Sequence, residues 1–207
     1  MMFNTKNIWI LLLCLVASLD AFSQYNMTNS KSRKIKFKLV NNIIIIPVEL
    51  NGTELSFVLD TGVTKPILLN ITEIDSSIAS KANTRYIRGL GGEGSVKSIL
   101  SKGNVLKIGD VTMINQEMYG VYDTFLNFTP RLGIPIHGII GYDLFKDFIV
   151  EINYSSKYIR LYKHSGFRPS KLKNWSVLPI SINKKKPFLD AVVKIEDKNT
   201  SVKLLMD

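Results

Sequence analysis

The stretch that decides the fold runs Phe57-Val58-Leu59-Asp60-Thr61-Gly62-Val63-Thr64. Three apolar residues that favour a strand lead straight into Asp60, and a carboxylate at the end of a buried strand is stable only when hydrogen-bond donors surround it. Gly62 lets the backbone turn sharply, so that main-chain N–H groups can point back at the carboxylate. The hydroxyl of Thr61 can hold the turn in place. We therefore expect a strand followed by a tight loop that presents Asp60 as a candidate catalytic group.

The end of the chain repeats this arrangement. Asp207 follows a second apolar run, 204–206, and each aspartate is preceded by a predicted hairpin, 43–59 in the first case and 187–206 in the second. Two carboxylates that such hairpins bring to a common axis share one proton, because like charges at short distance do not both ionise easily. The ionised member can act as general base on a water molecule while the protonated member polarises a peptide carbonyl. This chemistry requires neither a metal nor an organic cofactor, and we expect none.

The dominant period of the chain after residue 42 is two, with frequent turn residues, which predicts a mostly β protein. Residues 43–50 are expected to form a strand at an edge or with a bulge, because Pro47 has no N–H to donate. Asn51-Gly52 predicts a tight hairpin turn, and residues 142–148 are expected to contain one short helix. The other strands expected in the first part of the chain are 55–59, 67–69, 86–88, 96–100, 105–108, 111–113, 118–122, 149–152 and 158–162.

Residues 1–23 are predicted to be a secretory signal peptide. Lys6 precedes an apolar run that is too short to span a bilayer, and Ala21-Phe22-Ser23 fits a small-x-small cleavage site. An uncleaved membrane anchor is the alternative. Cys14, the only cysteine, lies inside this segment, so the mature protein would contain no thiol nucleophile and no disulfide. We expect an exported protein, periplasmic or extracellular, that meets the membrane only through export.

The mature chain is expected to divide into a first lobe, 24–162, a linker, 163–174, and the start of a second lobe, 175–207. The linker loses the alternation, and the pattern that opens the first lobe then restarts with expected strands near 175–182, 187–195 and 202–206. A lobe that ends on its catalytic loop lacks the strands that would cover its apolar faces. We therefore expect the sequence to be a fragment whose natural continuation after Asp207 is Thr-Gly or Ser-Gly.

Composition limits the classes of function. With 207 residues, 45% of them hydrophobic and 21% charged, the chain can bury a core. The net charge of +10 favours anionic surroundings, but the basic residues are scattered and are not interleaved with aromatic residues, so we expect no nucleic-acid partner. The run Lys184-Lys185-Lys186 is interpreted as solvated surface charge. His137 and His164 lack partners at metal-ligand spacing and are expected at surface or turn positions, with no metal site.

Three elements, in order along the chain, resemble those of the retropepsin-like aspartyl proteases, especially exported ones with two Asp-Thr-Gly lobes. Residues 57–64 look like the catalytic loop of that family. The run Gly89-Leu90-Gly91-Gly92-Glu93-Gly94 is similar to its glycine-rich flap. Residues 138–145, which contain Ile139-Ile140-Gly141, look like the strand that crosses beneath the catalytic loop and leads into a short helix. Together the three elements span most of residues 43–162.

The resemblance implies an all-β fold: a pepsin- or retropepsin-like closed barrel lobe with one short helix, followed by the first strands of a similar lobe. It also implies an aspartic endopeptidase of peptide or protein substrates, built as a pseudo-dimer of lobes in the full-length chain, with Asp60 and Asp207 as catalytic residues. In this interpretation Thr61 and Gly62 support the loop, Gly89, Leu90, Gly91 and Gly92 bind substrate, and Ile139, Ile140 and Gly141 hold the loop from beneath. Val63 departs from the hydroxyl residue that many members have there.

Two alternatives remain at this point. The barrel could serve as a non-catalytic peptide-binding or interaction module instead of an enzyme. Residues 122–137, which are aromatic and long for a plain connection, could either line the peptide-binding cleft or cover the barrel.

Overall fold

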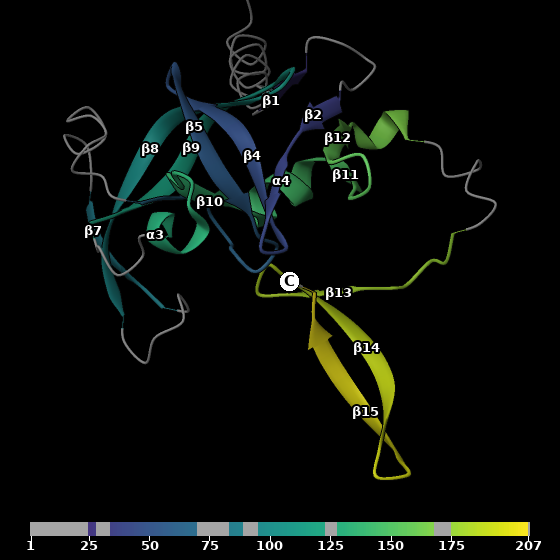
Figure 1. Ribbon diagram of the computed structural model, residues 1–207. Coiled ribbons are helices and arrows are strands. Elements are labelled where there is room, and N and C mark those ends of the chain that lie inside the picture. Colours follow the sequence, from purple (N-terminus) through teal and green to yellow (C-terminus); the bar gives the residue numbers. More distant parts are fainter. Residues whose placement is uncertain are drawn as a thin grey trace, which may run out of the picture.

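The computed structural model describes residues 25–27, 34–69, 83–88, 95–122, 128–167 and 175–206, and these are mainly strands (Figure 1). The main sheet has nine strands: β1 (Tyr25–Met27), β3 (Lys38–Val40), β4 (Ile43–Leu50), β5 (Thr53–Leu59), β6 (Ile67–Leu69), β7 (Asn83–Ile87), β8 (Val96–Ile108), β9 (Val111–Val121) and β10 (Gly138–Ile140). A three-stranded sheet joins β2 (Lys34–Lys36), β11 (Ile149–Asn153) and β12 (Tyr158–Tyr162), and another joins β13 (Ser181–Asn183), β14 (Lys186–Ile195) and β15 (Lys198–Leu205). The helices are α3 (Thr129–Leu132), α4 (Tyr142–Asp147) and the 3-10 turn η4 (His164–Gly166). The all-β prediction is confirmed, with α4 as the expected short helix, whereas α3 and η4 were not predicted.

The pairings of the main sheet close into a ring that runs β9, β6, β10, β5, β4, β8 and back to β9. The pairs β10–β5 and β6–β9 are parallel, whereas the hairpin pairs β4–β5 and β8–β9 are antiparallel. Each of the two long strands β8 and β9 replaces two shorter strands that the sequence predicted. The ladder between them shifts register between Ser101 and Leu106 without ending, because such a bulge bends a strand and leaves its flanking hydrogen bonds in place.

Pro47 lies within β4, and its position explains how an interior strand can contain a proline. On one side of β4 it stands opposite Ser56 of β5. On the other side β3 pairs with residues 43–45 and β8 pairs with Glu49 and Leu50, so no strand is paired with Pro47 there. The prediction of an edge strand was wrong for β4 as a whole. The missing N–H is tolerated because it falls between two neighbouring strands.

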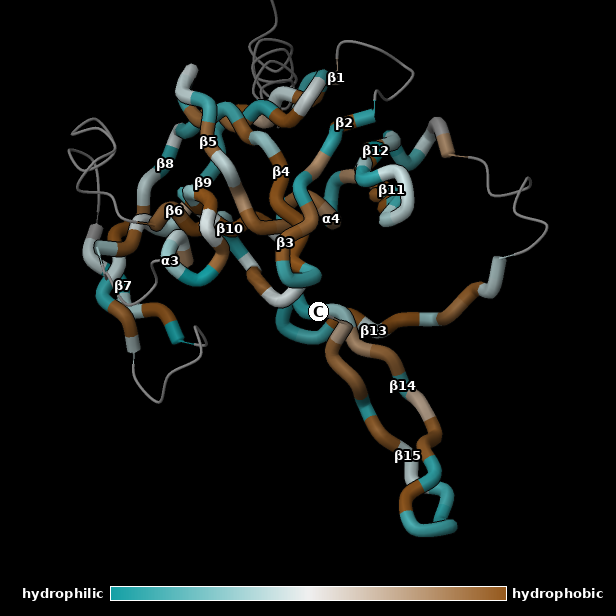
Figure 2. Tube along the Cα trace, viewed as in Figure 1, coloured by the Kyte–Doolittle hydropathy of each residue, from teal (hydrophilic) through white to brown (hydrophobic). Residues whose placement is uncertain are grey.

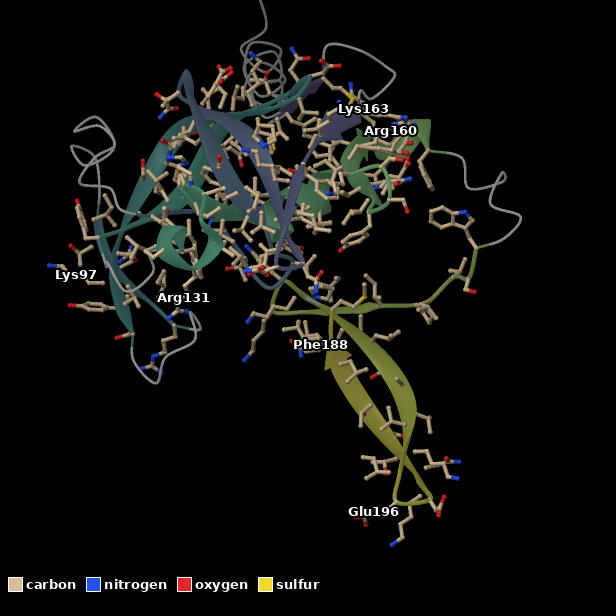
Figure 3. The ribbon with its side chains drawn as sticks, viewed as in Figure 1. Lys97, Arg131, Arg160, Lys163, Phe188 and Glu196 are labelled. Atoms are coloured by element: carbon tan, nitrogen blue, oxygen red, sulfur yellow. The ribbon has the colours of Figure 1, made fainter. Side chains whose placement is uncertain are left out.

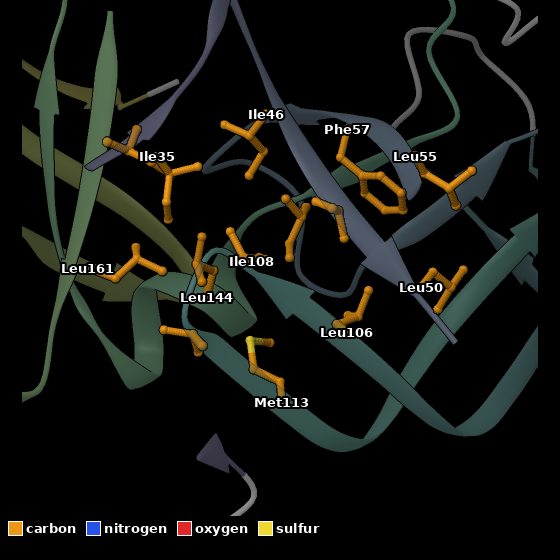
Figure 4. Close-up of a cluster of buried hydrophobic side chains, with 14 of the residues drawn as sticks. Ile35, Ile46, Leu50, Leu55, Phe57, Leu106, Ile108, Met113, Leu144 and Leu161 are labelled. Atoms are coloured by element: carbon orange, nitrogen blue, oxygen red, sulfur yellow. The ribbon is translucent and has the colours of Figure 1, made fainter. Parts of the chain in front are cut away.

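Two apolar clusters fill the main sheet, and Figure 4 shows part of the larger one. Phe57 of β5 and Leu144 of α4 are fully buried in it, so the helix closes one side of this core. Gly138 is required beside Phe57, because a Cβ at residue 138 would lie 2.4 Å from the phenylalanine ring. The strand that precedes Asp60 is therefore fixed by the core on which it packs.

The sheet of β13, β14 and β15 extends away from the main sheet as a long hairpin, with Phe188 near its base and Glu196 at its tip (Figures 1 and 3). Hydrophobic stretches, coloured brown, run along both long strands of this hairpin (Figure 2). Several of these side chains are largely exposed, including Val192 at 67% and Leu204 at 45%. The strand expected from residue 175 begins only at Ser181. Residues 175–180 pair with no strand among the described residues, and alternation alone does not form a strand without a partner. The division into two lobes stays a prediction.

Within the described ranges, no helix has the length and apolar character needed to cross a membrane. The predicted signal peptide, 1–23, lies outside these ranges.

Candidate active site

Main-chain hydrogen bonds hold Asp60 in the loop after β5, and one of them reaches its carboxylate. The N–H of Gly62 donates to Oδ1 of Asp60 over 2.7 Å, and the N–H of Val63 donates to the Asp60 carbonyl over 3.3 Å. The Asp60 N–H in turn donates to the carbonyl of Ile140 over 2.9 Å. Asp60 and its two successors are partly exposed, so the loop is accessible and yet fixed by hydrogen bonds. This is the turn that Gly62 predicted.

Strand β10 crosses beside this loop in parallel with β5, pairing Ile139 with Val58 and Ile140 with Leu59. The chain then passes so close to the loop that a Cβ on Gly141 would lie 1.9 Å from the carbonyl oxygen of Asp60. The structure thus brings Ile139, Ile140 and Gly141 against the Asp60 loop. No side chain fits at residue 141 while both backbones keep this path.

Thr61 connects the loop to the far end of the chain. Its hydroxyl donates a hydrogen bond to the carbonyl oxygen of Met206, the residue that precedes Asp207. Asp207 itself lies outside the described residues. At the base of the same hairpin, the ammonium of Lys185 lies 5.8 Å from the ring centroid of Tyr142, the first residue of α4. The C-terminal sheet therefore contacts both the Asp60 loop and the helix behind it.

The predicted flap residues Gly89, Leu90, Gly91 and Gly92 lie outside the described residues. The strands on either side of them are described. β7 and β8 are antiparallel and pair Ile87 with Val96, so residues 88–95 connect two neighbouring strands. Tyr86, on β7, is 68% exposed.

A cleft of about 260 Å³ opens directly beside the loop. Its lining comes from the residues after Asp60, from β6 and β9, from the end of β7 and from the start of β14: Gly62, Val63, Thr64, Lys65, Ile67, Ile87, Arg88, Tyr119 and Lys186. The run of residues 62–65 forms one wall, and Arg88 stands immediately before the predicted flap. Three of the lining residues are basic and none is acidic.

An ion-pair network anchors Lys65 at this cleft. Its ammonium lies 2.8 Å from Oε2 of Glu117, and the ammonium of Lys102 lies 2.9 Å from Oε1 of the same carboxylate. Hydrogen bonds from Lys65 and Lys102 lower the pKa of Glu117 to about 2. Burial opposes the charge of Lys65, but the hydrogen bond to Glu117 and nearby carboxylates leave the pKa of the lysine above its ordinary value. Lys65 is therefore a fixed positive charge at neutral pH.

A second cavity, of about 370 Å³, lies between the loop, α4 and the C-terminal sheet. Thr61, Tyr142 and Phe145 line it on one side, and Ile182 and Met206 line it on the other. Close by in α4, burial raises the pKa of the Asp143 carboxyl, which the nearby lysines only partly offset.

Several of these groups were not predicted from the sequence. Lys65 and Glu117 meet across the sheet although they are 52 positions apart, and no local pattern marks them as partners. Lys186 belongs to a run interpreted as solvated charge, yet it lines the cleft. The only signal in the sequence was that Lys65 closely follows Asp-Thr-Gly and that Arg88 directly precedes the glycine run.

His137 has a structural position rather than a place in the cleft. The N–H of Ser56 donates to its Nδ1 over 3.0 Å, and its carbonyl accepts from the N–H of Leu69. Of the segment 122–137, residues 123–127 lie outside the described residues. In the rest, Phe128, Leu132 and Ile134 pack against the smaller apolar cluster, so this part covers the core.

Comparison with known proteins agrees with this geometry. Residues 46–144, which run from β4 through the Asp60 loop to α4, match the family model described as aspartyl protease. This match supports a retropepsin-like aspartyl protease family for the chain.

Two solved structures are among those similar to this retropepsin-like chain. A retropepsin-like aspartic protease from Rickettsia conorii has 16% sequence identity, covers 68% of this chain and 97% of its own, and has a TM-score of 0.45. The EIAV protease in complex with the inhibitor HBY-793 has 23% identity, covers 50% of this chain and 85% of its own, and has a TM-score of 0.34. A search of curated proteins returned no match.

Proposed function

We propose that this protein is an aspartic endopeptidase whose catalytic pair is Asp60 and Asp207. The observation that carries the proposal is the hydrogen bond from Thr61 to the carbonyl of Met206. Thr61 directly follows Asp60, and Met206 directly precedes Asp207, so this contact supports the proposal that the two aspartates act together. An incidental contact of the C-terminal hairpin would not be expected to involve the residues next to both aspartates.

In the proposed mechanism the two aspartates hold one water molecule and share one proton. The ionised carboxylate takes a proton from the water as it attacks the peptide carbonyl, and the protonated carboxyl donates to the carbonyl oxygen. Collapse of the tetrahedral intermediate breaks the C–N bond, and a proton passes to the leaving nitrogen. The hydrogen bond from the Gly62 N–H holds the Asp60 carboxylate in orientation throughout. Residues 89–92 would close over an extended peptide.

In this proposal the lobe that contains Asp60 and the lobe that contains Asp207 form a pseudo-dimer within one protein. We propose further that the protein acts after export, in the periplasm or outside the cell, on peptide or protein substrates. The predicted signal peptide and the absence of cysteine from residue 24 onward support this location.

Cleavage of an unstructured protein such as casein tests the proposal, with the longest natural reading frame that contains this sequence as the enzyme. Asp60→Asn and Asp207→Asn should each abolish cleavage between pH 4 and 7, while circular dichroism shows the fold intact. Asp110→Asn, a substitution in the turn between β8 and β9, is the matched control and should cut at the wild-type rate. Undiminished cleavage by the Asp60→Asn protein would remove this residue from the mechanism.

The rival function is a peptide-binding module on the same fold. It is favoured if neither the wild type nor any variant cuts while the wild type and Asp60→Asn bind extended peptides with equal affinity. The exposed apolar residues of β14 and β15 are the one observation that suits an interaction protein.

A further inference from the structure

We propose that the cleft beside the Asp60 loop is a subsite for an acidic side chain of the substrate, so that the enzyme prefers a glutamate or aspartate near the cleaved bond. This inference rests on the proposed function, because it names the substrate class of the same site. Its basis is the set of charges and apolar surfaces that line the cleft.

The position of the cleft suits a side chain of a bound peptide. It is lined by residues 62–65, which directly follow Asp60, and by Ile87 and Arg88 at the end of β7. A peptide bound along the Asp60 loop would pass this opening. The volume of about 260 Å³ is sufficient for one side chain and is too small for a folded segment.

The charges of the cleft favour an anion. Lys65, Arg88 and Lys186 approach it from three separate parts of the chain. Glu117 partly neutralises Lys65, but the same carboxylate is shared with Lys102, so positive charge remains in excess. Neither Arg88 nor Lys186 forms an ion pair within the described part of the chain. A carboxylate entering the cleft would supply the missing partner, and a lysine side chain would be repelled.

The remaining lining suits the stem of such a side chain. Val63, Ile67 and Ile87 form apolar surface on which methylene groups can pack, and Tyr119 contributes to the same wall. A lining that combines apolar side chains with cations suits glutamate, whose side chain is apolar up to its carboxylate.

The test uses fluorogenic peptides built on a sequence that the full-length enzyme cleaves. Glutamate, glutamine or lysine is placed in turn at each of the four positions on either side of the cleaved bond. At one position the glutamate peptide should have a kcat/KM about tenfold above that of the glutamine peptide, mainly because its KM is lower. The lysine peptide should have the lowest kcat/KM of the three. The preference should weaken as salt rises from 0.05 to 0.5 M. Peptides with an amidated C-terminus test whether the preference comes from the side-chain carboxylate or from the terminal carboxylate. A preference that disappears on amidation would overturn the proposal.

Arg88→Glu gives the sharpest variant, because it should reverse the order and make the lysine peptide the better substrate at that position. Reversal cannot result from misfolding, which would lower cleavage of every peptide. Lys97→Glu makes the same charge change on the neighbouring β8, away from the cleft lining, and should keep the wild-type preference (Figure 3). An unchanged order in the Arg88→Glu protein would overturn the subsite.

Failure of the subsite and failure of the peptidase can be told apart. If peptides are cut with no preference at any position, the peptidase stands and the subsite is wrong. If the protein cuts nothing in the casein assay, glutamate, glutamine and lysine versions of one extended casein-derived peptide are titrated into the Asp60→Asn protein by fluorescence anisotropy. Tighter binding of the glutamate peptide then supports the subsite without the enzyme, and equal binding of all three overturns it.

Discussion

Thr61 in the first loop donates its hydroxyl hydrogen to the carbonyl oxygen of Met206 at the end of the last strand. This bond joins two residues that are 145 positions apart and that follow strands of different sheets, β5 and β15. A cation–π contact between Lys185, at the base of the hairpin, and Tyr142 of α4 is a second connection between the C-terminal sheet and the rest of the protein. The orientation of the C-terminal hairpin is therefore coupled to the conformation of the Asp60 loop.

Replacing Thr61 tests this coupling. Thr61→Val keeps the shape of the side chain but removes the donor, so it should lower kcat by about 10- to 100-fold, because displaced catalytic groups lose alignment. The free energy of unfolding should fall by about 1 kcal/mol, the usual value of one hydrogen bond. Thr61→Ser retains the hydroxyl and should recover most of the activity in the same casein assay. Equal activity of the two variants would show that the hydroxyl does not align the site.

Gly141→Ala should be among the most destabilising single-methyl changes in the chain. The new Cβ would meet the backbone of Asp60 at 1.9 Å, and neither strand can move without breaking the pairing between β5 and β10. We expect a loss of at least about 3 kcal/mol in urea unfolding, or no folded protein. Gly52→Ala is the control, since its Cβ points into open space and only the positive φ of 90° opposes it, at about 1 kcal/mol. Similar losses in both variants would contradict the close approach at residue 141.

Glu117 should contribute to stability in a pH-dependent way. Its pKa is about 2 in the folded protein, below the ordinary value of a glutamate, so the ionised form stabilises the fold. That contribution is fully present above about pH 4.5 and is lost as the pH falls through the folded pKa near 2. Because the side chain is 35% exposed, the contribution is about 1 kcal/mol or less.

The measurement is urea unfolding of the wild type and Glu117→Gln at pH 7, 4 and 2.5. The difference between the two proteins should be largest at pH 7 and should shrink at pH 2.5. A difference that grows on acidification would show that the ion pairs with Lys65 and Lys102 do not set the stability of this network.

Leu106→Ala in the core should lower the stability much more than Val192→Ala in the exposed hairpin. Leu106 is fully buried in the larger apolar cluster, and its truncation should cost about 2–5 kcal/mol because a cavity remains. Val192→Ala on β14 removes an apolar side chain that is 67% exposed and should change stability by less than about 0.5 kcal/mol. Thermal unfolding monitored by circular dichroism compares them, and a large loss for Val192→Ala would mean that another surface covers the hairpin.

The sequence predicted those features that depend on neighbouring residues. The Asp60 loop follows from a strand, a carboxylate and a glycine in succession, and α4 follows from the residues after Gly141. The strands β4, β6 and β12 have the predicted bounds, because alternation and turn residues mark both of their ends.

Features that depend on distant partners were missed. β8 and β9 each remain one strand across their register shifts because they pair with each other on both sides of those shifts. Pro47 can lie in an interior strand because it falls in the gap between β3 and β8. In the cleft, the meeting of Lys65 with Glu117 likewise depends on which strands lie side by side. The catalytic roles of Asp60 and Asp207 remain predictions for the experiments above.

The parallel pairing of β5 with β10 also determines when the Asp60 loop can take shape during synthesis. The loop requires the carbonyl of Ile140 and the close approach of Gly141, both of which leave the ribosome long after residue 60. Until then the emerging chain has the aspartate but not the geometry that orients it. Parallel pairings between distant segments form slowly, because the intervening chain must first be closed into a loop. A nascent chain shorter than about 140 residues would therefore hold Asp60 in an unorganised loop, and the carboxylate would take its orientation only after most of the first ring of strands had been made.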